Sequence, residues 1–157
     1  MLFLFGGCTE QSTQRSYTNT LYGFSLNPPA GWKQIDSKLP DVAVCFSPEN
    51  SSDVSLVIGV SFILGEGRAL STIADEVEQN LSESGVNYTV HSRDWRSIPN
   101  VNAYEIVYSI EQEGMVNYVK QVAIMKTRTV FVVTFTAPAT ASTNYLSDVE
   151  PSIDTFV

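Results

Sequence analysis

The chain has 157 residues and a mass of 17.3 kDa, a length typical of one domain. Hydrophobic residues make up 43% of the sequence and charged residues 17%, a balance that excludes an intrinsically disordered chain. Nine Lys and Arg stand against seventeen Asp and Glu, and the net charge of −8 repels the phosphates of nucleic acids. We therefore expect one globular domain, a monomer, that does not bind nucleic acid.

The chain begins with an apolar stretch that ends in Gly6-Gly7-Cys8. Residues 2–5 are too few to span a bilayer, which takes about 20 apolar residues. Small residues before a cysteine resemble a lipobox, in which the cysteine is diacylated and two acyl chains give a stable membrane anchor. Only seven residues, none of them basic, precede Cys8, which is less than a complete signal peptide. We expect lipidation of Cys8; the alternative is a chance apolar start or a truncated signal.

Residues 9–20 are rich in Ser, Thr and Gln and show no apolar periodicity before Tyr17. This composition is typical of a flexible tether, or of an ordinary frayed terminus. We therefore divide the chain into a possible lipobox and tether, residues 1–16, and a single domain, residues 17–157.

The domain begins with sequence typical of strands. Residues 21–26 and 32–35 flank the turn signal NPPAG, which predicts a short hairpin with Trp32 buried beside it. Residues 42–46 alternate as a strand that would bury the thiol of Cys45. Residues 54–63 are apolar on both faces, as in a central strand, and Gly59 indicates a bulge or a close contact. Two cysteines and one histidine are too few for a zinc site, and we expect no metal or cofactor.

The period then changes to that of a helix. Ile73, Val77 and Leu81 recur every four residues, Ser71 or Thr72 can cap the first turn, and Gly85 ends the segment. The outward face carries only acids, which we interpret as a solvated surface and not as paired carboxylates for catalysis or a metal: Asp75, Glu76, Glu78 and Glu83.

Four strands are predicted next, joined as a meander: residues 88–95, 103–110, 116–125 and 129–137. Simple alternation on the first of these places His91 and Arg93 on one face and Ser92 and Asp94 on the other, so no Ser-His-Asp site forms from these neighbours. The last segment has apolar residues at helical spacing, with Thr143 as a cap, Pro151 at a restarted first turn and Phe156 buried. The order of elements indicates an α+β fold.

A family resemblance rests on YGFSLNPPAGW (residues 22–32), CFSPENSSDVSLVIGV (45–60), KQVAIMKTRTVFVVTFTAPA (120–139) and SIDTFV (152–157). These segments resemble PsbP-like proteins, relatives of an extrinsic subunit of photosystem II, over about residues 17–157. The resemblance implies an α/β/α sandwich around a central antiparallel sheet of about six strands, a fold shared with a protein that releases nucleotide from the GTPase Ran. It also implies no enzymatic activity. Where plant members carry a His-Gln pair, this chain has Lys120-Gln121.

The chain lacks GxSxG, HExxH, P-loop and dinucleotide-binding motifs. The strongest candidate for a partner-binding surface is the last hairpin, where Lys120, Lys126 and Arg128 gather three of the nine basic residues. Solubilising charges at a turn are the alternative interpretation.

Two functional hypotheses follow. The first is a non-catalytic domain, tethered to a membrane outside the cytoplasm, that binds or assembles with an unidentified protein partner. The second is a soluble small-ligand-binding or hydrolytic protein with a pocket assembled from distant residues, among them Glu66, Arg68 or His91.

Overall fold

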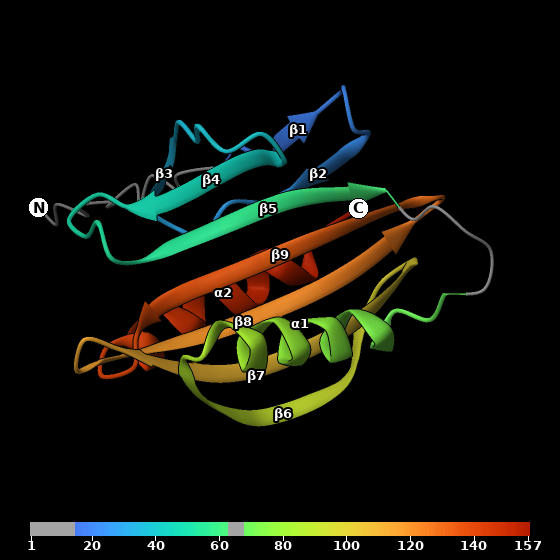
Figure 1. The fold of residues 1–157 in the computed structure, drawn as a ribbon. Helices are drawn as coiled ribbons and strands as arrows, with labels where there is room; N and C mark the ends of the chain where they lie inside the picture. The colour runs from blue at the N-terminus through green and yellow to red at the C-terminus, as the bar shows by residue number, and fades with distance from the viewer. Residues whose placement is uncertain (1–14, 63–67) are drawn as a thin grey trace, which may run out of the picture.

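The computed structural model describes residues 15–62 and 68–157, and these residues form the expected α+β fold (Figure 1). A seven-stranded antiparallel sheet lies between two helices, and a two-stranded hairpin is added on one side. The helix α1 (Ser71–Ser84) lies in front of the sheet in Figure 1 and α2 (Ser142–Asp154) behind it. The α/β/α sandwich is confirmed, with one strand more in its sheet than the sequence suggested.

The sheet has the strand order β3-β4-β5-β9-β8-β7-β6. Its strands are β3 (Trp32–Ile35), β4 (Val42–Pro48), β5 (Ser55–Phe62), β6 (Asn87–Ile98), β7 (Val101–Gln112), β8 (Met115–Lys126) and β9 (Thr129–Pro138). The strands β6 to β9 form the predicted meander, and its three turns each contain a non-glycine residue with positive φ: Asn100, Glu113 and Thr127. The strand β5 pairs with β4 on one side and β9 on the other, as expected for a central strand.

The predicted first hairpin is wrong. The strand β2 (Phe24–Leu26) pairs with β1 (Tyr17–Asn19) and lies outside the sheet, whereas β3 pairs with β4. The backbone of Ser25 in β2 exchanges two hydrogen bonds of 3.0 Å with Val157. The NPPAG turn thus connects two different layers, and Trp32 is only half-buried, against Phe135 and Tyr145.

The larger core lies between the sheet, α2 and the β1–β2 hairpin. Phe156 is fully buried, as predicted, and stacks on Phe24 with ring centroids 5.3 Å apart. Phe131 completes this cluster from the sheet. Burial of large aromatic side chains of this kind supplies much of a domain's stability. The space between the sheet and α2 is therefore more extensively packed than the space between the sheet and α1.

The helix bounds agree with the sequence pattern, but the caps do not. Leu70 and Ala141 occupy the two N-cap positions without side-chain capping bonds, and the Thr72 hydroxyl donates to the Ala69 carbonyl instead. Gly85 ends α1 with φ of 73°, as expected. Pro151 lies inside α2 and does not begin a new helix, so that prediction is also wrong.

Two single-residue predictions in the sheet are confirmed. Cys45 is a free, buried thiol on β4, and burial raises its pKa, which makes it unreactive. Gly59 pairs with Val42 at the register shift between β4 and β5, as the predicted bulge requires; a Cβ atom there would lie at ordinary contact distances, 3.5 Å from the Asp41 carbonyl and 3.8 Å from the Val132 carbonyl.

Candidate binding surfaces

The hairpin that joins β8 to β9 is the surface that the sequence singled out. Arg128 is exposed at its tip, next to Thr127 with φ of 58°. The ammonium of Lys126 donates to the Gly23 carbonyl at 2.7 Å and so joins this hairpin to the turn between β1 and β2. Arg128 is thus available at the surface, whereas Lys126 already has a structural partner.

Lys120 does not belong to this patch. It lies on β8 facing α2, and only 7% of it is exposed. Its ammonium contacts Glu150 of α2 and Glu105 of β7, the latter at 3.1 Å. The prediction that Lys120 belongs to a cationic surface patch with Lys126 and Arg128 is therefore wrong, because Lys120 points into the space between the sheet and α2.

Lys120 is one of five charged residues that we call the α2 ion network. Its other cation is Arg96 of β6, whose guanidinium lies 2.6 Å from Glu105 and 2.7 Å from Glu150. A third carboxylate, Asp154 of α2, lies 2.8 Å from the same guanidinium. The network joins α2 to the three strands β6, β7 and β8.

The pKa values of the network reflect its ion pairs. Burial lowers the pKa of Lys120, but the hydrogen bond with Glu150 and the charge of Glu105 outweigh burial and raise the net value. Burial raises the pKa of Glu150, but the bonds from Lys120 and Arg96 outweigh this effect and lower it. The pKa of Arg96 is raised because its three carboxylate partners outweigh burial. The arrangement keeps all of these groups charged and stabilises the docking of α2.

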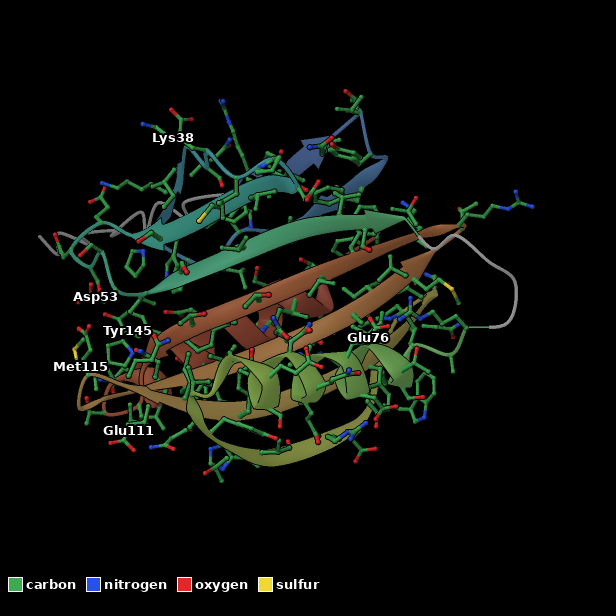
Figure 2. The ribbon with its side chains drawn as sticks, in the orientation of Figure 1. Lys38, Asp53, Glu76, Glu111, Met115 and Tyr145 are labelled. Carbon is green, nitrogen blue, oxygen red and sulfur yellow. The ribbon has the colours of Figure 1, made fainter. Side chains whose placement is uncertain are left out.

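On the opposite face, the acids of α1 are partly neutralised. Arg93 of β6 pairs with Asp75 and, at 3.0 Å, with Glu78. Arg68 pairs with Glu76, which Figure 2 labels on α1. The face was predicted to be solvated, and it does remain at the surface, but basic residues from outside the helix cover part of it.

A bulge in β6 changes the placement of His91. Val90 pairs with Tyr108 and Ser92 with Val107, so His91 is an extra residue in the strand. Its Nε2 lies 2.6 Å from the hydroxyl of Ser109, on the face opposite Arg93. The predicted alternation therefore fails at this residue. His91 and Arg68 lie apart, and Glu66 is outside the described residues, so the expected pocket of distant residues does not form from the two that can be placed.

The strand β6 carries a surface that the sequence analysis missed. It is the last strand of the sheet, and Trp95 on it is 60% exposed. The indole packs edge to face on Tyr104 of β7, with ring centroids 5.2 Å apart. Trp, Tyr and Arg are the residue types that dominate protein–protein hot spots, and Arg93 lies two residues before Trp95 on the same face. Trp95 is the one apolar residue among residues 91–97, and this was the available signal.

A small cavity lies between α1 and the sheet. Its volume is about 10 Å³, and its lining is apolar except for Gln121, whose Oε1 is buried without a hydrogen-bond partner. The amide nitrogen of Gln121 donates to the Thr134 hydroxyl at 3.3 Å. A volume of this size is at the lower limit for one water molecule.

Within residues 15–62 and 68–157, no group of three or more His, Cys, Asp or Glu is arranged to hold a metal ion. Of the two helices in the same ranges, neither is long and apolar enough to cross a membrane. Cys8, the predicted lipidation site, lies outside the described residues.

No protein-family model matches the chain. No curated protein matches it either. Solved structures do match. Cyanobacterial PsbP of Synechocystis sp. PCC 6803 has a TM-score of 0.72 at 16% identity, and the match covers 98% of both chains.

Two further structures have the same architecture. The Ran-binding protein Mog1p of Saccharomyces cerevisiae has a TM-score of 0.64 at 9% identity and covers 91% of this chain and 94% of its own. LpqN of Mycobacterium tuberculosis, which is involved in cell envelope biogenesis, has a TM-score of 0.59 at 15% identity and covers 86% and 82%. The resemblance to PsbP-like proteins is thus confirmed for the fold: the chain has the architecture that cyanobacterial PsbP and Mog1p also have.

Proposed function

We propose that this PsbP-like domain is a non-catalytic protein-binding module, held at a membrane outside the cytoplasm by lipidated Cys8. The observation that carries the proposal is the exposed Trp95, which rests on Tyr104 at the free edge of the sheet. Leaving a large apolar side chain in water is unfavourable, and aromatic residues of this kind act as anchors when a partner covers them. The role is therefore binding through a surface and not chemistry in a pocket.

The charged residues of the α2 ion network support a structural role and not a catalytic one. Arg96 and Lys120 both pair with Glu150, all three have shifted pKa values, and these pairs join α2 to the sheet. Shifted pKa values accompany structural ion networks as well as active sites. Here every shift in the network is explained by a partner within it, and no cofactor is needed to account for these residues.

The cellular part of the proposal rests on Cys8 and on the composition of residues 9–20. Two acyl chains would hold the domain at a membrane while a polar tether leaves it free to meet a partner. Structural similarity to LpqN, a protein of cell envelope biogenesis, agrees with a location outside the cytoplasm. Similarity to Mog1p, a Ran-binding protein, agrees with the use of this fold for protein binding.

The test has two parts and uses the full chain in the organism that encodes it. Cys8→Ser should move the protein from the membrane fraction to the soluble fraction. A photoreactive phenylalanine analogue at position 95 should give a discrete cross-linked product. The same analogue at Leu39 should not; Leu39 is 66% exposed and lies between β3 and β4, at the end of the sheet opposite β6. Soluble wild-type protein would refute the tether, and equal cross-linking from both positions would refute binding at Trp95.

A further inference from the structure

The free edge of the sheet offers backbone groups to a partner. Within the described residues β6 pairs only with β7, and in Figure 1 it forms the lower border of the sheet. A two-residue turn closes on the Ile98–Val101 pair, and pairs that exchange hydrogen bonds alternate with pairs that do not. Counting back from the turn, the N–H and C=O groups of Arg93, Trp95 and Ser97 point away from β7.

One of these amides confirms the direction. The backbone N–H of Trp95 donates to Oδ1 of the neighbouring Asp94 at 2.9 Å, and not to the strand beside it. Natural proteins often protect an edge strand with a charged side chain that discourages uncontrolled pairing. Asp94 occupies the place that a carbonyl of an added strand would take.

The charge around this edge selects the partner. The two salt-bridge groups that flank β6, together with Asp94, contain six carboxylates and three cations, a net charge of −3. The carboxylates are Asp75, Glu78, Asp94, Glu105, Glu150 and Asp154, and the cations are Arg93, Arg96 and Lys120. A cation that pairs with Asp94 would free the Trp95 N–H from its hydrogen bond with that carboxylate. A carbonyl of the incoming strand could then accept the hydrogen bond of this N–H.

We propose that β6 binds a basic, extended segment of a partner protein as an additional strand, with Trp95 covering one side chain of that segment. The inference rests on the proposed binding function and names its partner class. Main-chain hydrogen bonds to Arg93, Trp95 and Ser97 would give affinity, and Asp94 with its acidic surroundings would give preference for Lys or Arg. A second copy of this chain is the poorer occupant, because each copy carries a charge of −8.

The probe is a nine-residue peptide of alternating Lys and Val, acetylated and amidated at its ends. We expect it to protect the amides of Arg93, Trp95 and Ser97 from hydrogen exchange in a residue-resolved NMR measurement. The amides of Asp94 and Arg96, which already face β7, should keep their protection. The same peptide with Glu in place of Lys is the charge control and should bind at least about tenfold more weakly.

A matched pair of variants tests the backbone contact. Ser97→Pro removes one outward N–H without breaking a bond to β7, since proline is tolerated at the edge of a sheet. It should weaken peptide binding about tenfold, equivalent to about 1.4 kcal/mol, whereas Ser97→Ala keeps the amide and should bind like the wild type. Far-UV circular dichroism verifies that both variants fold.

The proposal fails if Ser97→Pro binds like Ser97→Ala, if the Glu peptide binds equally well, or if protection appears at other residues. It also fails if no peptide binds at 1 mM, or if the protein alone sediments as a dimer with the three amides already protected. None of these results affects cross-linking from position 95 in cells, so failure of the strand-addition mechanism is distinguishable from failure of the binding function.

Discussion

The two helices lie on opposite faces of one sheet, and they are held there by different contacts. The helix α2 buries Val149 and Ile153, is followed by the fully buried Phe156, and joins the sheet through the α2 ion network. The helix α1 buries only Ala74, and its ion pairs with Arg93 and Arg68 lie at the surface. The comparison teaches that the contacts between α2 and the sheet supply most of the stability. Substitutions in α1 should therefore lower the free energy of unfolding only slightly.

The largest expected effect is in the α2 layer. Phe156→Ala removes a fully buried ring that contacts Phe24 and Phe131, and should lower the free energy of unfolding by about 3–5 kcal/mol. Chemical denaturation measures the change. The partly buried Val77→Ala on α1 should cost about 1 kcal/mol. Equal losses in the two variants would remove the difference between the layers.

Two arginines of β6 provide the second comparison, because Arg93 pairs with α1 and Arg96 with α2. Arg96→Ala leaves three carboxylates with one remaining cation and should cost about 2–3 kcal/mol, less than a fully buried pair because Asp154 is half-exposed. Arg93→Ala should cost less than about 1 kcal/mol, as exposed pairs do. A larger loss for Arg93 than for Arg96 would contradict this ranking.

Acid should act on the same network. The pKa of Glu150 is lowered in the folded state, so its contribution to stability is present above its unfolded pKa of 4.5 and is lost as the pH falls through the lower folded value. Glu150→Gln should therefore flatten the fall of stability below about pH 4.5, measured by urea denaturation at several pH values. Glu83→Gln, on the exposed side of α1, is the charge-matched control and should keep the wild-type profile.

The smallest effect is expected at Gln121, the neighbour of Lys120 that faces α1. Gln121→Met removes a buried acceptor without a partner and gives up one long hydrogen bond to Thr134, so the free energy of unfolding should change by less than about 1 kcal/mol. Lys120→Met, one residue away on the α2 face, should be clearly more destabilising because Glu105 and Glu150 lose a cation. Thermal denaturation of the two variants compares the faces directly.

The local periodicity of the sequence predicted the elements, because it depends only on neighbouring residues. Strands β6 to β9 alternate with period two, and α1 repeats apolar residues every four positions, so these elements were found. The pairing of β2 was not: its hairpin partner β1 covers only residues 17–19, where Tyr17 alone is apolar, and its other partner, Val157, is far away in the chain. Long-range partners leave no periodic signal.

The lack of a sequence signal for long-range contacts also explains the errors in the candidate site. Lys120 looked like a surface charge, because nothing near it in the sequence indicates that Glu150 arrives opposite its ammonium from α2. His91 was placed on the wrong face, because a bulge adds one residue without changing the composition of the strand. Trp95 was overlooked, because exposure depends on which strand lies at the edge of the sheet, and strand order is a property of the folded chain.

The strand order also determines how the domain would respond to force. Seven strands spaced about 4.8 Å apart place β6 about 29 Å from β3, across the width of the sheet. A pull between β6 and the β3 side of the sheet would therefore act perpendicular to the strands. The hydrogen bonds between strands, when loaded in that direction, break one after another and not together. The domain should therefore unfold at low force.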